Sequence, residues 1–416
     1  MKKIAKTILG AATKAAIARN HYRIIAITGS VGKTSTKKAV SLVLQEKYKV
    51  LSFVEEGYNT EFGLPLILLE RKIPRSKLGW FILMLLLPLE ALKKRNYDYA
   101  VLEMGADRPG DIKYLTNLVK PDIAIITNVS GVHLEKFGTV NNVAKEKAKI
   151  LSALAEGGAA IINTDNEFTA KMAVPQGVRK ITFGRKSNEI KIIGQSFDSH
   201  SSLNRFKVYD KVLEIKSNAV GEHLLYSFAA AIAVGVSEKI DSNLIVSALG
   251  KYLPVRGRIN IIEGASGSVI LDDSYNASPA SMKNALDVLE KFPGKRKIAV
   301  LGAMGELGGQ AKEAHQKIGS YLVGKCDILV TVGDISKKYL AKSAIDAGLA
   351  EENVYSFNGS AIAGKYVKEI LQSGDIVLFK GSQNASRMEK AVKIVMKSPE
   401  SAFRRLPRQG KEWERR

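Results

Sequence analysis

The chain has 416 residues, of which 45% are hydrophobic and 25% charged, and its formal net charge is +22. This length exceeds what one hydrophobic core usually serves, so we expect two domains, and the ordinary composition argues against extended disorder. A single cysteine, Cys326, excludes an intramolecular disulfide framework, and five histidines without a Cys/His cluster give no support to a structural zinc site. The positive charge favours polyanionic partners: nucleotides, nucleic acid, acidic substrates or an anionic membrane surface.

The N-terminal segment MKKIAKTILGAATKAAIARN, residues 1–20, is basic and amphipathic. Lys6, Thr7 and Lys14 interrupt the continuous apolar core that a secretory signal needs. We therefore expect a helix that leads into the first strand. A capping helix is the favoured interpretation, and a helix lying on a membrane surface is the alternative.

The following strands and helices alternate along the first half, which is typical of α/β units with mainly parallel strands. We expect strands at 23–28, 99–103, 122–127 and 159–163, with helices such as 33–45 and 142–154. Residues 189–216 differ, because short β-like runs separated by polar turns predict a small antiparallel patch on the main sheet. Helical spacing returns at 221–236 and 241–249.

The most apolar stretch is LGWFILMLLLPLEAL, residues 78–92. It is too short to cross ~30 Å of hydrocarbon, and Pro88 and Glu90 lie inside it, so we predict no transmembrane segment. A buried helix is the favoured interpretation, and a helix that touches a membrane or a partner is the alternative. Basic residues lie on both sides of it: Arg71, Lys72, Arg75, Lys77, Lys93, Lys94 and Arg95.

The pattern restarts near residues 254–258 and predicts a second doubly wound domain. We expect its strands at 268–271, 297–301, 327–331, 353–357 and 375–379. We expect its helices at 281–291, 310–323, 336–347, 361–371 and 385–395. The predicted organisation is therefore a domain at 1–253, a domain at 254–398, and a loosely ordered basic tail at 399–416.

The sharpest motif is IIAITGSVGKTST, residues 24–36, in which an apolar strand runs into a glycine-containing loop and then a helix. Such a loop turns backbone N–H groups toward phosphate, and the helix N-terminus adds its dipole. Lys33 can reach the β- and γ-phosphates, and the Thr34 hydroxyl can bind Mg²⁺. Because Ile27 stands where the strict motif has its first glycine, this is a shorter form of the phosphate loop. Its candidate nucleotide contacts are Gly29, Ser30, Val31, Gly32, Lys33, Thr34 and Ser35.

Polar residues also follow two other predicted strands of the first half. Glu103 ends one strand, and Asn128 and His133 follow another. The carboxyl ends of parallel strands meet at one edge, so these residues should lie near the phosphate loop, where Glu103 and His133 could bind metal ions. Lys147, in VAKEKAKIL, lies on a basic helix that composition alone would assign to a solvated face.

Three strand-to-helix junctions of the second half carry residue types that suggest function. In VILDDSYNASP, residues 269–279, Asp272 and Asp273 end a strand and Asn276 lies in the turn that follows. LGAMGELGGQAKEAH at 301–315 and LFKGSQNASR at 378–387 are rich in glycine and small residues. All three are expected at one edge of the second sheet.

Taken in order, these segments resemble the Mur ligase family, and most closely its MurF type, which adds D-alanyl-D-alanine to a UDP-muramoyl tripeptide. The resemblance spans about residues 20–390 and implies an α/β fold. It implies a central P-loop ATPase domain with a mainly parallel sheet, followed by a Rossmann-like C-terminal domain. Its signatures are TGSVGKTST, GYNTEFGLP, LEMGA, TNVSGVHLEKFGT, VAKEKAKI, INTDN, GRINIIEG, DDSYNASPASM, VLGAMGELG and FKGS.

The resemblance also implies an activity. A carboxylate and an amine would be joined at the expense of ATP through an acyl phosphate, in peptidoglycan precursor synthesis and hence in cell-wall biogenesis and cell shape. The cofactors would be ATP and Mg²⁺, the acceptor an acidic peptide, and the amine donor an amino acid or dipeptide. The location would be cytoplasmic.

The same resemblance implies roles for single residues. Lys33, His133 and Lys147 would be catalytic. Thr34, Glu103 and His133 would bind metal ions, and so would Lys147, which matches a lysine that family members carbamylate. The second domain would reach ATP through Arg258, Asp273 and Asn276, and Asn128 would approach the adenine.

Several positions depart from the family pattern. Because the phosphate loop comes so early in the sequence, we expect the family's usual N-terminal domain, which grips the UDP-sugar, to be missing. The residue-level departures are Lys149 in place of Glu, Leu224 and Ser227 in place of Asn, Ala303 in place of Asp, and Gln383 in place of Arg.

Two alternatives stay open from these departures. The first is another ligase on the same scaffold, similar to folylpolyglutamate synthase or to MurT with a lipid-linked acceptor. The second is a non-catalytic, nucleotide-dependent binder of anionic surfaces. We do not expect nucleic acid among the partners, and we leave open peripheral contact of residues 1–20 or 78–92 with the inner membrane face.

Overall fold

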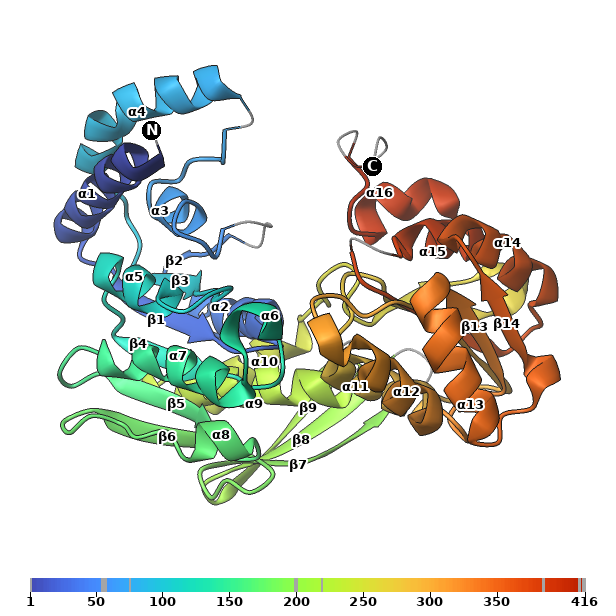
Figure 1. Ribbon diagram of the computed structural model, residues 1–416. Helices are drawn as coiled ribbons and strands as arrows, with labels where there is room; N and C mark the ends of the chain where they lie inside the picture. The colour runs from blue at the N-terminus through green and yellow to red at the C-terminus, as the bar shows by residue number, and fades with distance from the viewer. Residues whose placement is uncertain are drawn as a thin grey trace. The chain divides into compact units, whose positions relative to one another are not determined.

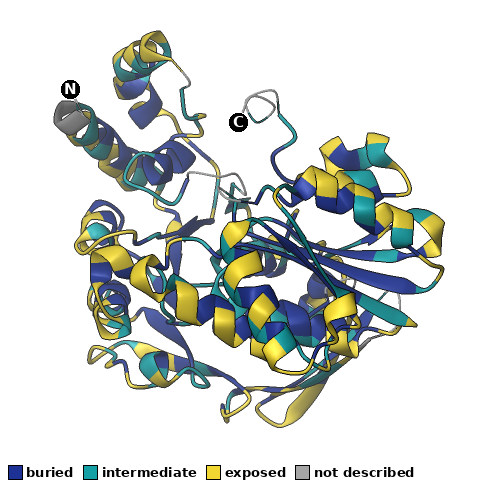
Figure 2. Cartoon of the chain, turned by 45° about the vertical axis from the view of Figure 1, so that its right-hand side comes forward, coloured by how far each residue is buried: buried dark blue, intermediate teal, exposed yellow. Residues whose placement is uncertain are grey.

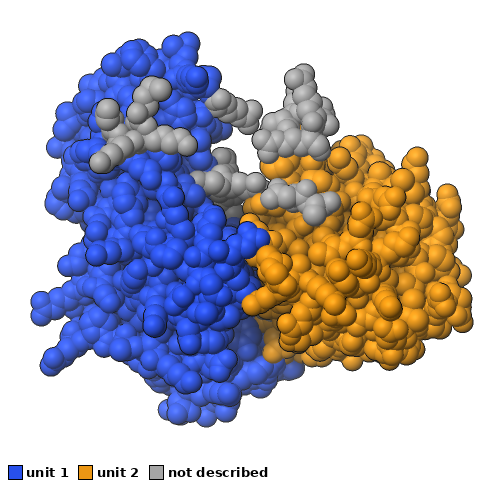
Figure 3. Space-filling model, viewed as in Figure 1, with its two compact units in different colours: residues 1–194, 205–215, 224–252 blue, residues 195–204, 216–223, 253–416 orange. Residues whose placement is uncertain are grey.

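The computed structural model describes residues 2–53, 58–74, 76–197, 201–217, 220–383, 386–410 and 413. The chain divides into two compact units (Figure 3). Unit 1 comprises Met1–Gly194, Arg205–Ile215 and Leu224–Tyr252, and unit 2 comprises Gln195–Asn204, Lys216–His223 and Leu253–Arg416.

The first sheet has the strand order β2-β3-β1-β4-β5-β6-β7-β8-β9 over the described residues. Each neighbouring pair from β2 to β7 in this order is parallel. The strands are β1 Arg23–Thr28, β2 Val50–Leu51, β3 Tyr99–Glu103, β4 Ile123–Ile126, β5 Ala159–Asn163, β6 Arg179–Gly184, β7 Ile190–Phe197, β8 Ser202–Val208 and β9 Lys211–Ser217. Every residue of β3, β4 and β5 is buried, as expected for parallel strands that are covered on both faces.

Register brings the ends of three central strands together. In the β1–β3 pair Ile27 lies opposite Glu103, and in the β1–β4 pair Thr28 lies opposite Ile126. The loops that follow β1, β3 and β4 therefore leave the sheet at the same edge, which is where parallel sheets bind ligands.

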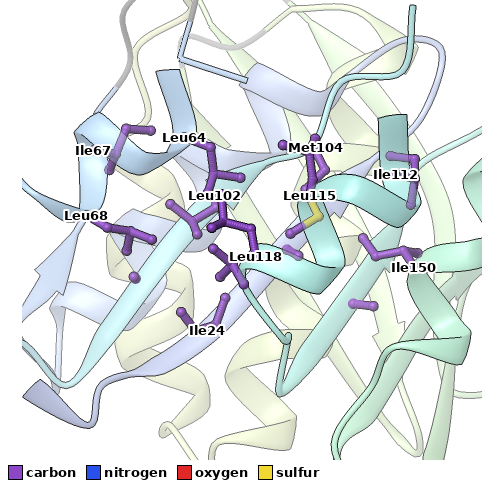
Figure 4. Close-up of a cluster of buried hydrophobic side chains, with 14 of the residues drawn as sticks. Ile24, Leu64, Ile67, Leu68, Leu102, Met104, Ile112, Leu115, Leu118 and Ile150 are labelled. Atoms are coloured by element: carbon purple, nitrogen blue, oxygen red, sulfur yellow. The ribbon is translucent and has the colours of Figure 1, made fainter. Parts of the chain in front are cut away.

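Helices cover both faces of this sheet (Figure 1). One face packs against α1, α3, α5 and α7, and side chains such as Leu64, Leu115 and Ile150 share one core with Ile24 and Leu102 of the strands there (Figure 4). The helices α2, α9 and α10 pack on the other face. The helices are α1 Lys2–Asn20, α2 Lys33–Gln45, α3 Gly63–Leu68, α4 Lys77–Leu92, α5 Asp111–Leu118, α6 Leu134–Phe137, α7 Val140–Ser152, α8 Glu167–Ala170, α9 Glu222–Ser237 and α10 Ser242–Gly250.

The second sheet has the order β10-β11-β15-β12-β13-β14 over the described residues, with β10 antiparallel and the others parallel. It lies between α11 to α13 on one face and α14 to α16 on the other. The strands are β10 Asn260–Glu263, β11 Val269–Asp273, β12 Arg296–Gly302, β13 Ile328–Val332, β14 Val354–Phe357 and β15 Asp375–Lys380. The helices are α11 Pro279–Lys291, α12 Ala311–Tyr321, α13 Lys342–Asp346, α14 Ser360–Ile370, α15 Glu389–Val395 and α16 Ala402–Arg405, with short η1 Ala265–Gly267, η2 Gly308–Gln310, η3 Ser336–Ala341, η4 Glu351–Asn353 and η5 Pro399–Ser401.

The predicted fold class, an α/β chain with two mainly parallel sheets, is confirmed. The strands predicted at 23–28, 99–103 and 159–163 and the helix at 33–45 have the predicted bounds. The β-like runs predicted at 189–216 form β7, β8 and β9, which extend the far end of the main sheet, and β7 pairs with β6 in parallel. The start of the helix predicted at 385 lies outside the described residues.

The expectation of a loosely ordered tail is wrong for the described residues 399–410. The tail forms η5 and α16, and Leu406 is fully buried against the α14–α15 face of the second sheet. Arg408 is also buried and hydrogen-bonded, as described below. Apolar burial and a paired arginine therefore fix a segment whose basic composition suggested loose order.

The favoured prediction of a buried helix at 78–92 is also wrong. The segment is helical, but of α4 only Leu83, Leu87, Glu90 and Ala91 are buried, and other large apolar side chains face outward. Among the described residues no helix combines the length and the apolarity needed to cross a membrane.

Candidate active site

The loop between β1 and α2 has backbone geometry that requires glycine. Gly29 has φ +152°, and a Cβ there would lie 1.9 Å from Thr127 Oγ1, which is a clash that no side chain tolerates. Gly32, with φ +87°, precedes α2 in the left-handed region that glycine populates freely. Two glycines thus set a tight turn that ends at a helix N-terminus, the geometry of a phosphate-binding loop.

The loop after β4 is hydrogen-bonded to this turn. Ser30 N donates to Asn128 O at 3.0 Å, and Val31 N donates to Asn128 Oδ1 at 2.9 Å. Thr127 Oγ1 donates to Val31 O at 2.6 Å. Asn128, predicted to approach adenine, contacts the phosphate loop in this structure, and its role toward a nucleotide stays a prediction.

The two charged residues predicted for phosphate and metal lie together at the loop. Lys33 Nζ donates to Gly29 O at 2.8 Å, which folds the side chain over the turn. Thr34 Oγ1 donates to Glu103 Oε2 at 3.1 Å, so the helix N-terminus and the end of β3 share one site. The predicted grouping of Lys33, Thr34 and Glu103 is therefore present in the structure. Ser35, also predicted as a contact, is buried in the first turn of α2.

Lys37 completes this group and escaped the sequence analysis. Its ammonium lies 3.2 Å from Glu103 Oε1 and also donates to Phe53 O, and the side chain is buried. The sequence could have indicated this pairing, because Lys37 lies on the same buried face of α2 as Val40 and Leu44. A lysine on a buried face needs a partner that offsets its charge. Glu103 is thereby fixed between a hydroxyl and a cation.

His133 and Lys147 lie near the same loop. His133 Nε2 is 3.4 Å from Asp107 Oδ1, and Asp107 in turn interacts electrostatically with Lys147. Lys147 is only 2% exposed, so the basic face that composition suggested is not its environment. Burial, followed by the neighbouring charge of Lys33, lowers the pKa of Lys147 to about 7.

The side chains beside the phosphate loop include oxygen donors of the kind that Mg²⁺ prefers. The described residues contain no group of three or more His, Cys, Asp or Glu side chains that could hold a metal ion. Mg²⁺ is commonly bound by one or two carboxylates, with substrate phosphates and waters as its other ligands. The adjacent Glu103 carboxylate and Thr34 hydroxyl, beside a phosphate loop, fit that mode of binding.

In unit 2 the predicted residues gather at the carboxyl edge of β11 and β15. Asp273 Oδ2 accepts from Lys380 Nζ at 2.6 Å, and Lys380 also donates to Asn276 O at 2.9 Å. Lys380 is fully buried, and it was not assigned a role from the sequence. The ion pair therefore fixes the DDSYN turn to the KGS segment.

The neighbouring Asp272 has a different environment. It is fully buried, its Oδ1 accepts from Ser274 N at 3.2 Å, and its Oδ2 has no hydrogen-bond partner within the described part of the chain. Burial raises the pKa of Asp272 to about 7. The two adjacent carboxyls thus have different environments, since Asp273 is paired with Lys380 and Asp272 is fully buried without a cation partner among the contacts given above.

The guanidinium groups of two arginines lie close to the ring of Tyr275. The Arg258 guanidinium lies 4.4 Å from the ring centroid, and that of Arg408 lies 5.5 Å from it. Arg408 also donates to Tyr275 O at 2.8 Å and to Ser274 O at 2.7 Å, and it pairs with Glu389 Oε2 at 2.8 Å. Arg258 was predicted as a site residue, whereas Arg408 comes from the tail and was missed.

Comparison with known proteins gives matches over most of the chain. Residues 27–235 match the Mur ligase middle domain, and residues 257–383 match the Mur ligase, glutamate ligase domain. The UDP-N-acetylmuramoyl-tripeptide–D-alanyl-D-alanine ligase of Escherichia coli is 28% identical over 380 residues, which is 90% of this chain and 77% of that protein. The ligase of the same name from Synechocystis is 30% identical over 91% of this chain and 76% of that protein.

A solved structure agrees with these relatives. MurF ligase from Thermotoga maritima in complex with ADP superposes with a TM-score of 0.79 and 26% identity, covering 96% of this chain and 84% of that one. The matched domains, the aligned relatives and the shared fold all point to one family. The chain belongs to the Mur ligase family of ATP-dependent, ADP-forming amide ligases, as a member of the MurF type.

Proposed function

We propose that the chain joins the terminal carboxylate of a UDP-muramoyl tripeptide to the amine of D-alanyl-D-alanine in the cytoplasm. The observation that carries the proposal is the grouping of Lys33, Thr34, Glu103 and Lys147 around a phosphate loop. The support for the substrates is the alignment, over 90% of the chain, with a ligase that bears these substrates in its name. We also propose residues 1–253 as the ATP-binding domain and 254–398 as the C-terminal domain.

The reaction has two steps that balance. A carboxylate oxygen of the acceptor takes the γ-phosphoryl group of ATP, which leaves ADP and an acyl phosphate. The neutral amine then attacks the acyl carbon, loses a proton and expels phosphate, so that one amide forms for each ATP consumed. Mg²⁺, when bound, supplies positive charge that offsets the charge developing on the transferred phosphoryl group.

The residues of the phosphate loop would bind and orient the nucleotide. Lys33 now lies on Gly29 O, and a phosphate is a stronger acceptor than that carbonyl, so its ammonium would turn to the β- and γ-phosphates. Gly29 to Ser35 would surround the phosphates, and Thr34 and Glu103 would hold Mg²⁺. Lys37 keeps Glu103 in place, because it neutralises a carboxylate that is otherwise buried.

Lys147 is suited to carbamylation. Only the neutral amine reacts with carbon dioxide, and the burial that lowers its pKa to about 7 favours that form. The product carries a negative charge beside Lys33 and would offer oxygen ligands where an ammonium offers none. We propose that carbamylated Lys147 and His133 would hold a metal ion, which would supply further positive charge beside the phosphates.

Unit 2 would contribute the second half of the nucleotide contacts. We propose that Arg258, Asp273 and Asn276 meet ATP, with the Asp273–Lys380 ion pair keeping the turn in shape. Exclusion of water from the site would protect the acyl phosphate from hydrolysis.

Substrate dependence of ADP formation tests the proposal. We expect ADP only when ATP, Mg²⁺, UDP-muramoyl tripeptide and D-alanyl-D-alanine are all present, and only traces when either the acceptor or the amine is left out. Lys33→Ala should lower the rate by on the order of 100-fold or more, since it removes charge stabilisation of the transferred phosphoryl group. The control is Lys113→Ala, which removes an exposed lysine of α5 and should leave the rate unchanged.

Two results would contradict the proposal. One is equal ADP formation by Lys33→Ala and the unaltered chain. The other is ADP formation with a muropeptide lacking UDP or a lipid-linked acceptor, but none with the UDP-linked tripeptide.

A further inference from the structure

The helix α4 carries an apolar face that points away from the protein. Its outward side chains recur every three or four residues and so lie along one side of the helix. Each is between 47% and 67% exposed, and they are Leu78, Phe81, Ile82, Leu85, Leu89 and Leu92. In Figure 2 the exposed colour marks this side of the helix, and Figure 1 shows α4 lying beside α1. An apolar surface of this kind marks an interaction site.

The opposite face fixes the helix in this orientation. Leu83, Leu87 and Ala91 are buried in the core that also contains α1, and Trp80 packs edge-on against Phe62 at 5.6 Å. Ser76 caps the first turn by accepting from Gly79 N at 3.0 Å. Turning the exposed leucines inward would expose this packed face, so the outward apolar surface is a property of the folded unit.

A buried ionic group locks the end of α4. Glu90 is buried and pairs with Arg71, with Lys93 at 2.8 Å and with Arg95 at 3.3 Å. Burial alone would raise the pKa of this carboxyl, yet the hydrogen bonds from Arg71 and Lys93 lower it. The acid inside the apolar segment is thus directed inward and neutralised.

The charges that surround the face are positive. Lys72 and Lys77 are exposed before the helix, and Lys93 and Lys94 are exposed after it. Within 71–96 Glu90 is the sole acidic residue of the sequence, and the exposed Glu70 just before this segment pairs with Arg95 at 3.1 Å. An apolar face with cations at both ends matches a bilayer surface, whose acyl region is apolar and whose headgroups can be anionic.

We propose that this face of α4 docks the enzyme on the surface of an anionic lipid bilayer, with the helix lying in the plane of the membrane. The helix has 16 residues, too few to cross ~30 Å of hydrocarbon, so it lies on the membrane and does not span it. A second copy of the chain fits the face less well, because antiparallel pairing of two α4 helices would bring Lys77 toward Lys93 and Lys94 of the other copy. The inference goes beyond the proposed ligase activity and does not depend on it.

Binding of the full chain to vesicles tests the inference. We expect the protein to sediment with vesicles of phosphatidylcholine containing phosphatidylglycerol, more weakly with phosphatidylcholine alone, and less at high salt. The triple variant Phe81→Gln, Leu85→Gln, Leu89→Gln should reduce the partition coefficient by at least about tenfold, since three side chains no longer enter the apolar layer. The double variant Lys77→Gln, Lys94→Gln should reduce binding to the anionic vesicles only.

A matched control removes equally exposed apolar side chains elsewhere. Val212, Ile362 and Phe403 are 58%, 58% and 67% exposed, and their triple replacement by Gln should leave vesicle binding unchanged. Equal binding by the α4 variant and this control would overturn the inference. So would a failure of the unaltered chain to bind anionic vesicles, or a dimer in solution that the α4 variant abolishes while vesicle binding is absent. The lipid-free ligase assay is unaffected by any of these results and tests the activity separately.

Discussion

Three buried lysines show how the surroundings decide what a cation does. Lys37 pairs with Glu103, and Lys380 pairs with Asp273, so in each case a carboxylate offsets the cost of burying the lysine. Lys147 lies near the positive charge of Lys33, and its pKa is lowered to about 7. The first two lysines hold site residues in place, and we propose the third for carbamylation.

Replacing Lys147 tests its proposed modification. Lys147→Ala should lower ligase activity by on the order of 100-fold or more, because the negatively charged group beside Lys33 is lost. Acetate or formate should restore part of the activity, since a short carboxylate can enter the space of the removed side chain. Steady-state ADP formation with and without these anions measures the effect.

The matched control for this experiment is Lys145→Ala, on the same helix with an exposed side chain. It should keep full activity and show no response to added carboxylates. Full activity of Lys147→Ala, or a loss that carboxylates leave unchanged, would rule out the carbamate.

At the level of residues the sequence predicted the phosphate loop well. Gly29 and Gly32 are required by local backbone geometry, and local geometry is what a short motif encodes. The pairing of Glu103 with Thr34 followed from parallel strands ending at one edge. Lys37 and Asp107 were missed, because their partners are distant in sequence and only tertiary packing brings them together.

Among the elements, the C-terminal tail gives the clearest departure from expectation. A basic segment with Pro407 and Gly410 suggested loose order, yet Leu406 is buried and Arg408 is 8% exposed. Arg408 donates to the backbone of Ser274 and Tyr275 in the DDSYN turn. The tail therefore stabilises, through hydrogen bonds, a turn that we propose contacts ATP.

Replacing Arg408 tests whether the tail stabilises this turn. Arg408→Ala should lower the unfolding free energy of the chain by roughly 3 kcal/mol, because it removes one of the two arginine partners of the buried Glu389 and the hydrogen bonds donated to Ser274 O and Tyr275 O. The KM for ATP should rise as the turn loosens. Urea denaturation followed by circular dichroism measures the first effect, and ADP formation at varied ATP measures the second.

Arg404→Ala is the control for the Arg408 variant, since it removes an exposed arginine of α16. Its effect on unfolding should stay within about 0.5 kcal/mol. An Arg408→Ala variant as stable as this control, with an unchanged KM for ATP, would show that the tail contributes nothing to the turn.

The bounds of long periodic elements could be predicted from the sequence. The exposure of the apolar face of α4 could not. The bounds of β1, β3, β5 and α2 follow from apolar runs bounded by glycine or polar residues. The helix α4 is apolar on both sides, so periodicity alone could not tell a buried helix from one with a free apolar face. The edge strand β10 was missed because it has four residues and only one of them is buried.

For the whole molecule, two sheets each present their strand ends with the predicted residues gathered there. Unit 1 carries the phosphate loop with Glu103 and Lys147, and unit 2 carries the DDSYN turn with Lys380. The sequence could predict this because each unit is a repeated strand–helix pattern that directs its loops to one edge. Family membership adds the chemistry that such edges perform in related chains.

The central claim is that ATP activates the carboxylate of the acceptor as an acyl phosphate. Isotope transfer tests this most directly, with UDP-muramoyl tripeptide carrying ¹⁸O in its terminal carboxylate, D-alanyl-D-alanine and ATP. The account predicts that each amide formed yields one phosphate containing one ¹⁸O atom, detected by mass spectrometry. Amide formation with unlabelled phosphate, or no amide and no ADP from these substrates, would contradict it.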